Sequence, residues 1–462
     1  MDLGEALPPL EVDIDLIRRL DRNGPRYTSY PTADRFGNFT ADDYRFWAEK
    51  RDKANPLSIY VHLPFCNTIC YYCACNKVIT KDKEKAAEYL RYLFLEIEMQ
   101  GEIFGKDSPV EQLHFGGGTP TFLSDEEMAA LVEKIGNHFR FVENGEYSIE
   151  IDPRKVNEAT IANLAKIGFN RISLGVQDFD RQVQLAVNRI QSEEETLRVI
   201  HAARAEGFKS LSIDLIYGLP KQSLDGFLKT LEKVIAAGPD RISIYNYAHL
   251  PLVFKPQRRI EEKDLPSPAE KLDILAQTIS LLTHSGFSYI GMDHFARPSD
   301  ELAIAQRNGK LHRNFQGYST HADCDLVALG VSAIGRIGPT YSQNFRTLED
   351  YYSHIERKEL PIMRGLVLDQ DDLLRREIIQ ALMCHFSLSK SDFERKFSIV
   401  FDEYFGNELE KLGEYEKEGL IELERNAVTV SPKGRLLIRN LCMVFDRYLS
   451  LDENQVKYSK VI

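Results

Sequence analysis

The stretch YVHLPFCNTICYYCACNKVIT, residues 60–80, carries the most informative pattern in this 462-residue sequence. It holds four of the seven cysteines, and the first three, Cys66, Cys70 and Cys73, have the spacing C-x3-C-x2-C. Thiolates this close together repel one another and need a cation, unless they pair as a disulfide. The spacing therefore predicts a metal-binding loop.

The number of cysteines favours an iron–sulfur cluster over zinc. Three protein ligands leave one iron of a 4Fe–4S cluster open to an external ligand, whereas tetrahedral zinc needs a fourth Cys or His. Cys75 could supply that ligand, but with only Ala74 between them Cys73 and Cys75 would form a strained pair. We predict a cluster held by Cys66, Cys70 and Cys73, with zinc or a disulfide as the alternatives.

Length and composition indicate a multidomain globular protein. The chain is 43% hydrophobic and 28% charged, and its length favours two or three domains. A net charge of −12 argues against nucleic acid as a partner. The acidic N-terminus lacks the pattern of a signal peptide, no apolar run is long enough for a membrane span, and seven cysteines, an odd number, do not suggest a secreted disulfide framework. The expected compartment is the cytoplasm.

Apolar, β-branched runs alternate with helix-like stretches over residues 56–260. Such alternation is typical of parallel strands joined by crossover helices. Six consecutive units predict an α/β fold, an open or partial (β/α)6-type barrel. The expected strands are 56–64, 110–118, 146–153, 171–177, 210–220 and 241–248, and the expected helices include 86–100, 125–139 and 194–208.

Polar residues follow these strands in succession, where parallel barrels place their chemistry. Three glycines at 116–118 allow a ligand to approach the backbone closely. Asp152 and Asp178 are the residues of this set best explained as helix caps or turn residues. The strand-end set comprises His62, Glu150, Asp152, Gln177, Asp178, Asp214, Tyr245 and Tyr247.

The remaining regions suggest a three-part chain: an arm over 1–35, a catalytic domain over 36–365 and a C-terminal domain over 366–462. The arm contains RYTSYPT and is either a surface strap whose tyrosines pack on the main domain or a lid with Arg26 pointing inward. Within the catalytic domain we expect a helix over 267–287, a strand-like piece over 288–298 and pocket-shaping loops over 311–338.

The C-terminal domain is predicted to be mostly helical and winged-helix-like. Helices are expected over 371–386 and 401–419, followed by two short strands and a final helix. Its acidic character favours a packing or substrate-covering role over DNA binding. Cys384 and Cys442 lie in apolar helical settings and are expected to be buried.

The motifs together resemble a known family. C-x3-C-x2-C and GGGTP (116–120) resemble those of radical S-adenosylmethionine (radical SAM) enzymes. Cys75, RYTSYPT, SLGVQDF, IDLIYGLP, YNYAHLP, GMDHFARP and NFQGYST resemble one group within them, the oxygen-independent coproporphyrinogen III oxidases (dehydrogenases) of heme biosynthesis. The resemblance covers essentially the whole chain.

The resemblance implies roles for individual residues. Cys66, Cys70 and Cys73 would ligate the cluster, and Cys75 would lie beside a second S-adenosylmethionine without binding iron. Tyr72 stands where other members can carry a different aromatic ring. The first S-adenosylmethionine would be held by Tyr60, Gly117, Glu150 and Ile334, and the second by Tyr72, Gly118, Thr119, Gln177, Arg189, Asp214 and Ala248.

The implied reaction converts two propionate side chains of coproporphyrinogen III to vinyl groups, giving protoporphyrinogen IX. A 5′-deoxyadenosyl radical would take a hydrogen from the propionate β-carbon, which general acid–base catalysis cannot activate. The expected partners are this substrate and a flavodoxin- or ferredoxin-like electron donor, and the chain is expected to be a monomer.

Two hypotheses remain beside this one, and a third concerns substrate binding. A heme-binding chaperone of the same superfamily is disfavoured by Cys75 and by RYTSYPT, and a radical enzyme acting on another tetrapyrrole is the other alternative. From the residues alone we also expect Arg26, Arg297 and Arg313 to bind substrate carboxylates, unless they form ordinary ion pairs.

Overall fold

The computed structural model describes residues 7–449 and residue 460. The chain packs into two compact units, one made of 1–35, 268–322 and 368–462 and the other of 36–267 and 323–367. The three-part division expected from the sequence stays a prediction, because packing units are not necessarily domains that fold alone. Residues 1–6 of the expected arm and most of the chain after 449 lie outside the described residues.

Six parallel strands form the centre of the unit made of 36–267 and 323–367. They pair in the order β1-β4-β5-β6-β7-β8, each parallel to the next. This confirms the predicted partial (β/α)6 arrangement; within the described residues β8 does not pair with β16 at the far edge, so no closed barrel forms there. The bounds are β1 (Leu57–Leu63), β4 (Pro109–Gly117), β5 (Arg140–Ile151), β6 (Arg171–Gln177), β7 (Ser210–Tyr217) and β8 (Arg241–Asn246).

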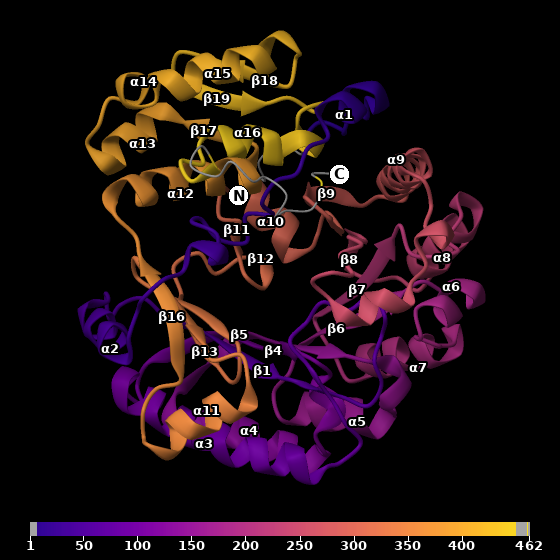
Figure 1. Ribbon diagram of the computed structural model, residues 1–462, viewed down its shortest axis with the longest axis vertical. Coiled ribbons are helices and arrows are strands. Elements are labelled where there is room, and N and C mark those ends of the chain that lie inside the picture. Colours follow the sequence, from indigo (N-terminus) through magenta and orange to yellow (C-terminus); the bar gives the residue numbers. More distant parts are fainter. Residues whose placement is uncertain (1–6, 450–459, 461–462) are drawn as a thin grey trace. The chain divides into compact units, whose positions relative to one another are not determined.

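Helices lie outside these strands (Figure 1). Strand residues such as Ile59, Val61 and Leu113 are buried beneath them. Two of the helices start with capping boxes, Ser124 with Glu127 and Ser192 with Glu195, which satisfy the first free amides. The helices are α2 (Ala41–Lys50), α3 (Glu84–Phe104), α4 (Asp125–His138), α5 (Glu158–Lys166), α6 (Arg181–Ala186), α7 (Glu193–Ala205), α8 (Leu224–Ala236) and α11 (Leu348–Glu356).

The expectation of loops over 311–338 is wrong. β13 (Asp325–Leu329) pairs parallel with β1, and the antiparallel strands β14 (Ile334–Ile337), β15 (Thr340–Asn344) and β16 (Ile362–Val367) extend the sheet beyond it. Figure 1 shows β13 near β1, with β16 farther out on the same side. The buried run of β13 is only five residues long, too short to show a clear period.

The other unit contains two hairpins within 268–322. The strand-like piece expected over 288–298 is a hairpin of β9 (Ser288–Gly291) and β10 (His294–Ala296). A second hairpin joins β11 (His312–Asn314) to β12 (Gly317–Ser319), again where loops were expected. The helices of this segment are α9 (Pro268–His284), which confirms the long helix expected there, and α10 (Glu301–Arg307).

The C-terminal part of this unit is mostly helical, as predicted. The expected strands β18 (Ile421–Leu423) and β19 (Ala427–Val430) are present, and β17 (Ser387–Ser389) adds a third strand to one edge. Cys384 and Cys442 are fully buried. The helices are α12 (Gln370–His385), α13 (Lys390–Phe397), α14 (Phe401–Tyr404), α15 (Gly406–Lys417) and α16 (Ile438–Val444), so the single helix expected over 401–419 is interrupted at Phe405.

The N-terminal arm packs on these C-terminal residues. It starts with α1 (Ile14–Leu20), and Tyr27 and Tyr30 farther along are almost fully buried. Tyr27 donates a hydrogen bond of 3.0 Å to Asp446, and the Tyr30 ring lies 6.1 Å from the Tyr448 ring. A strap on the main domain was expected; the tyrosines instead pack on the C-terminal segment.

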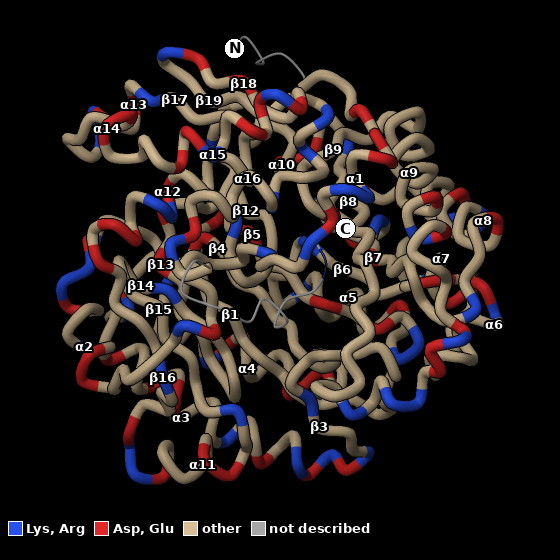
Figure 2. The backbone as a smooth tube through the Cα atoms, turned by 45° about the horizontal axis from the view of Figure 1, so that its top comes forward, with Lys and Arg blue, Asp and Glu red and all other residues tan. Residues whose placement is uncertain are grey.

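Acidic and basic residues are interspersed along the chain path (Figure 2). This arrangement is typical of a water-facing surface with both signs of charge. Within residues 7–449, no helix is long and apolar enough to cross a membrane.

Candidate active site

A pocket of about 290 Å³ lies at the carboxyl ends of the parallel strands. Because these ends meet at one edge of the sheet, side chains far apart in sequence converge there. It brings together eleven of the fourteen residues predicted to bind the cluster or S-adenosylmethionine. They are Cys66, Cys70, Tyr72, Cys73, Gly117, Gly118, Thr119, Glu150, Gln177, Arg189 and Asp214.

The cysteines follow β1 on a loop bracketed by β2 (Phe65–Cys66) and β3 (Val78–Ile79). Cys66 Sγ lies 3.5 Å from Thr119 Oγ1, and Cys70 Sγ accepts a hydrogen bond from Arg189 at 3.7 Å. All seven cysteines of the chain are free thiols, so the disulfide alternative is not present.

The cysteine thiols of the loop differ in pKa because their surroundings differ. Burial raises the pKa of Cys66 to about 11. The pKa of Cys73 is lowered to about 6, chiefly by a hydrogen bond with Cys75 and also by the Lys77 ammonium, which outweigh burial. Lys77 also donates to the carbonyls of Cys73 at 2.9 Å and Cys75 at 3.2 Å, which fixes this turn of the loop.

The glycine run is needed for close packing. A Cβ on Gly118 would lie 2.7 Å from the Pro64 carbonyl, and one on Gly117 would lie 2.7 Å from the His62 ring. Gly117 also has φ +113°, which favours glycine. The amides of Gly118 and Thr119 donate to the carbonyls of Leu63 and Phe65, so the run holds the cysteine loop against β4.

Glu150, near the end of β5, is the carboxylate of the pocket nearest this run. The Gly117 amide donates to it at 3.2 Å, and His114 Nε2 lies 3.4 Å from it. Burial alone would raise the pKa of Glu150, but His114 and this amide outweigh burial and hold the pKa below its usual value. The side chain is therefore an anion at neutral pH, with 45% of its surface exposed.

A network of ionic contacts surrounds Arg189. Asp152 accepts from Arg154 at 2.6 Å and lies 3.6 Å from Arg189, while Arg189 donates to the Gly175 carbonyl at 2.5 Å. Arg189 Nε nevertheless is buried without a hydrogen-bond partner in the described part of the chain.

Gln177 stands out for its backbone and its side chain. Its φ is +70°, and the register between β6 and β7 shifts at this point, which turns the residue at the strand end. Its Oε1 is buried and has no hydrogen-bond partner among the described residues. A buried unsatisfied acceptor at a pocket wall is suited to a ligand donor.

Asp214 occupies the next strand, β7. Ser173 donates to it at 3.0 Å. Burial raises the pKa of Asp214 to about 6, and the Glu150 charge adds to the increase. This carboxyl group therefore titrates near neutral pH.

Three predicted cofactor residues do not line the pocket. Tyr60 stacks on His114 and lies 3.0 Å from His62 Nδ1, so it adjoins the Glu150 side of the pocket. Ile334 begins β14. Ala248 lies beyond β8 and is tied to the cysteine loop through Gln257, whose amide donates to the carbonyls of Ala248 and Tyr72 at 3.2 Å each.

The prediction that Asp152 and Asp178 are helix caps or turn residues is confirmed, Asp152 as a cap and Asp178 as a turn residue. Asp152 caps the short 3-10 helix η3 (Pro153–Lys155), and it also lines the pocket. Asp178 accepts from the Asp180 amide, Gln222 and Thr230, and it has no place in the pocket lining. Of the other strand-end residues, Tyr245 lines the pocket and Tyr247 is in the core.

Arg154, Ser173 and Gln257 were missed from the sequence. Arg154 and Ser173 line the pocket, while Gln257 is buried in the 3-10 helix η4 (Lys255–Arg259). Ser173 could have been predicted from the sequence, because it lies on a predicted strand two positions before Gly175. Gln257 lies in an irregular segment and gave no signal.

The three arginines expected to bind carboxylates have different surroundings, all within the unit that contains the C-terminal residues. Arg26 forms an ion pair with Asp293. Arg297 donates to the Ser285 carbonyl at 2.8 Å and lies over the Phe287 ring. Arg313 is buried over the Tyr318 ring.

Comparison with known proteins identifies the family. A model of the Radical SAM superfamily matches residues 60–234, and a model of the HemN C-terminal domain matches residues 368–437. The chain is 51% identical over 460 residues to an oxygen-independent coproporphyrinogen III oxidase of Pseudomonas aeruginosa, covering 99% of this chain and 100% of the relative.

A second relative and a solved structure agree. The Escherichia coli protein of the same name is 46% identical over 457 residues, covering 99% of this chain and all of that one. The solved structure of Escherichia coli coproporphyrinogen III oxidase, described as a radical SAM enzyme, matches with a TM-score of 0.92 over 96% of this chain and 100% of that chain. The chain therefore belongs to the oxygen-independent coproporphyrinogen III oxidase family of radical SAM enzymes.

Proposed function

We propose that this protein is the enzyme that decarboxylates two propionates of coproporphyrinogen III without oxygen, giving protoporphyrinogen IX in heme biosynthesis. One observation carries the proposal. The three cysteines of C-x3-C-x2-C, the glycine run and the strand-end polar residues converge on a single pocket, in a chain 51% identical to a coproporphyrinogen III oxidase.

Cys66, Cys70 and Cys73 would hold a 4Fe–4S cluster. Three free thiols on one loop, all lining the same pocket, fit a cluster with three protein ligands. Zinc fits less well, since the fourth thiol on the loop, Cys75, is exposed and separated from Cys73 by one residue. When bound, the cluster and S-adenosylmethionine supply a 5′-deoxyadenosyl radical able to remove hydrogen from an unactivated carbon.

The first S-adenosylmethionine would lie against Gly117 and Glu150, with Tyr60 and Ile334 adjoining. Glu150 is an anion in the pocket wall, which suits the ammonium group of the methionyl moiety. Gly117 and Gly118 both line the pocket, so their backbone forms part of the wall that the cofactor would contact.

The second S-adenosylmethionine would lie between Tyr72, Gly118, Thr119, Gln177, Arg189, Asp214 and Ala248. Gln177 Oε1 and Arg189 Nε are a buried acceptor and a buried donor without partners in the described structure, as a polar ligand would require. Asp214 offers a further acceptor. The Gln257 bridge would hold the Tyr72 and Ala248 sides of this site at a fixed spacing.

The protein's own part is to bind, orient and shield the reacting groups. Arg26, Arg297 and Arg313 stay proposed anchors for substrate carboxylates, and their different surroundings make them unequal candidates. We further propose a flavodoxin- or ferredoxin-like electron donor, a monomeric enzyme, a cytoplasmic location and domain breaks near residues 35 and 365.

Anaerobic incubation of the cluster-loaded protein with coproporphyrinogen III, a reductant and S-adenosylmethionine tests the proposal. Release of CO2 with formation of protoporphyrinogen IX is expected. Tight heme binding without CO2 would instead support the chaperone, and turnover of a different tetrapyrrole alone would also contradict the proposal.

A further inference from the structure

Arg313 is a buried guanidinium with unusual surroundings. Its side chain projects from β11, in a hairpin where it faces Tyr318 of β12, and only 3% of the residue is exposed. The guanidinium carbon lies 4.8 Å from the centre of the Tyr318 ring. Stacking of this kind orients an arginine and leaves its N–H groups available.

The hairpin that carries Arg313 is fixed on α12. The Gln380 side chain accepts a hydrogen bond from the Arg313 amide at 3.1 Å and donates to the Arg313 carbonyl at 2.7 Å. Tyr318 donates to the Met383 carbonyl at 3.0 Å. Backbone and ring are thus both held, so the guanidinium position is set before any ligand binds.

Arg313 Nε and Nη1 are buried and have no hydrogen-bond partner among residues 7–449 and 460. No described carboxylate forms an ion pair with it, whereas Arg26 is paired with Asp293. Burying a charge without an opposite charge is costly, so such an arrangement is retained where an anion binds.

Nearby charges make this region electropositive. Arg439 is buried within the same unit, and burial together with the charges of Arg26 and Arg313 lowers the pKa of Arg439 to about 9. Arg313 and Arg439 therefore both add positive charge to this part of the unit, which favours an anion there.

We propose that Arg313 binds a propionate carboxylate of the macrocycle, one of those that the reaction does not remove. This inference rests on the proposed function, and it selects Arg313 from the three arginines considered. A carboxylate supplies the acceptors that Nε and Nη1 lack, through charge-assisted hydrogen bonds. Arg313 would then be a specificity-determining residue that recognises a carboxylate which the product keeps.

The test compares Arg313→Gln with Arg307→Gln in the cluster-loaded, full-length protein. Arg307 is an arginine of the same unit whose side chain donates to the Pro298 carbonyl. We expect Arg313→Gln to raise both the Kd for coproporphyrin III, measured by its fluorescence, and the KM for coproporphyrinogen III by at least about tenfold, with kcat within about twofold. Arg307→Gln should leave all three within about twofold.

Esterified macrocycle distinguishes charge recognition from general packing. The wild type should bind coproporphyrin III more tightly than its tetramethyl ester, and Arg313→Gln should reduce that preference by about the same factor as its loss in affinity. Arg313→Met, which keeps the stem but not the charge, should behave like Arg313→Gln.

Stability gives a further readout. Removal of an unpaired buried charge should leave the urea midpoint of the ligand-free protein unchanged or higher. A lower midpoint with unchanged Kd, KM and ester preference would mean that Arg313 is structural, and the inference would be wrong. Loss of phosphate or chloride inhibition without a change in coproporphyrin binding would assign the residue to a small inorganic anion and would also overturn it.

The outcome is separable from that of the proposed function. If the wild type releases CO2 and Arg313→Gln has the same Kd and KM as the wild type, only the inference is contradicted. A wild type that binds coproporphyrin III through Arg313 but releases no CO2 would contradict the proposed function and keep the carboxylate site.

Discussion

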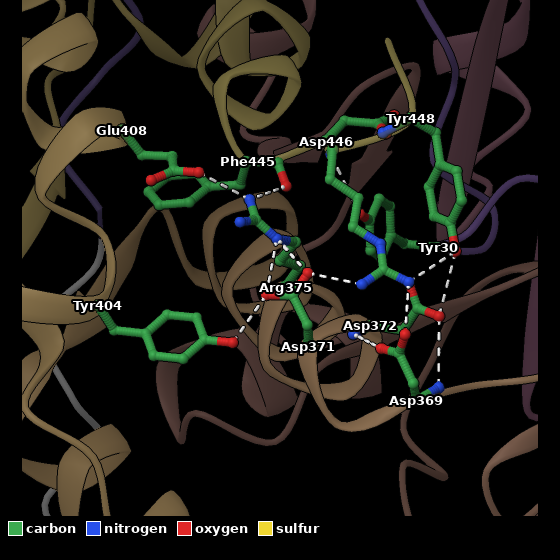
Figure 3. Close-up of polar contacts among 11 residues, drawn as sticks. Tyr30, Asp369, Asp371, Asp372, Arg375, Tyr404, Glu408, Phe445, Asp446 and Tyr448 are labelled. Atoms are coloured by element: carbon green, nitrogen blue, oxygen red, sulfur yellow. Dashed lines mark hydrogen bonds and ion pairs between the residues drawn. The ribbon is translucent and has the colours of Figure 1, made fainter. Parts of the chain in front are cut away.

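Two polar regions, one in each compact unit, differ in how their charges are satisfied. In the C-terminal region Arg375 donates to Asp371, to Glu408 and to the Phe445 carbonyl (Figure 3). Arg447 donates to Asp369 and Asp371 at the start of α12. In the strand-end pocket Gln177 Oε1 and Arg189 Nε are buried without partners among the described residues.

This difference indicates that the C-terminal region contributes to the stability of the protein and that the pocket contributes to ligand binding. A buried charge that is fully paired holds elements together, and its loss leaves the partners unpaired. A buried polar atom without a partner contributes no such support, and where its residue lines a pocket, as Gln177 and Arg189 do, it is available to a ligand. Substitutions in the C-terminal cluster should therefore change the free energy of unfolding, and those in the pocket should change cofactor binding.

The largest effect is expected from Cys66→Ala. Loss of one of three proposed ligands should leave little iron after anaerobic reconstitution and reduce activity to background. Cys75→Ser should retain about four irons per cluster-loaded chain, since this thiol is not a proposed ligand. Iron content and sulfide content measure both, and loss of iron from Cys75→Ser would contradict the proposed ligand set.

Arg375→Met should cost roughly 2–4 kcal/mol of unfolding free energy, because it leaves Glu408 without its ion-pair partner and removes one of the two arginines that pair with Asp371, in a region only partly open to water. S-adenosylmethionine affinity should not change. The matched control is Arg395→Met, which removes an exposed ion pair with Asp392 and should have little effect. Urea unfolding and calorimetric titration measure the two quantities; reduced affinity would show that the two regions are not separable.

Gln177→Leu should weaken S-adenosylmethionine binding roughly tenfold, the effect of one lost hydrogen bond, with little change in stability. Gln184→Leu is the control, because the Gln184 side chain has hydrogen-bond partners in the protein. It donates to the carbonyls of Asp178 and Gln191 and accepts from the Gln191 amide. Gln184→Leu should lower stability by roughly 1–3 kcal/mol and leave affinity unchanged. Equal effects of both variants on affinity would remove the distinction.

Asp214→Asn gives the smallest and most pH-dependent effect. The pKa of Asp214 is about 6 in the folded protein and 3.8 in its usual range. The folded state therefore binds more protons between these values, and wild-type stability falls as pH rises from about 4 to 6. The free energy of unfolding of the variant does not fall in this way. At pH 7 the variant should therefore be more stable than the wild type by about 1 kcal/mol, a value reduced for solvent screening, and near pH 4 the two should be equal.

The same substitution should affect ligand binding in the opposite direction. Wild-type affinity for S-adenosylmethionine should rise as pH increases through about 6, since the ionised carboxylate is the better acceptor. Asp214→Asn should show weaker binding with no such rise. Titrations at pH 5 and pH 7 check this, and parallel pH profiles would contradict the assignment.

Much of the fold and site could be predicted because its signals are local. The six central strands follow from short apolar runs with polar ends, and the pocket follows from the rule that parallel strands gather their carboxyl ends. The cysteine spacing and the glycine run lie within contiguous segments, so their convergence in the pocket needed only that rule.

The rest depends on contacts between distant residues. Glu96 lies in an amphipathic helix yet is fully buried, and it accepts hydrogen bonds from the Gly330 amide, Asn344 and Tyr351 at 2.6–2.7 Å. Burial raises the pKa of Glu96 to about 7. Gly330 follows β13, Asn344 ends β15 and Tyr351 lies in α11, and local patterns did not predict these elements.

The central claim is that radical formation and decarboxylation belong to one site. The most direct measurement is the amount of 5′-deoxyadenosine formed per CO2 released during anaerobic turnover of coproporphyrinogen III by the cluster-loaded protein. We predict one 5′-deoxyadenosine for each CO2 and no CO2 from Cys66→Ala. Formation of 5′-deoxyadenosine without CO2, or CO2 release by Cys66→Ala, would contradict the claim.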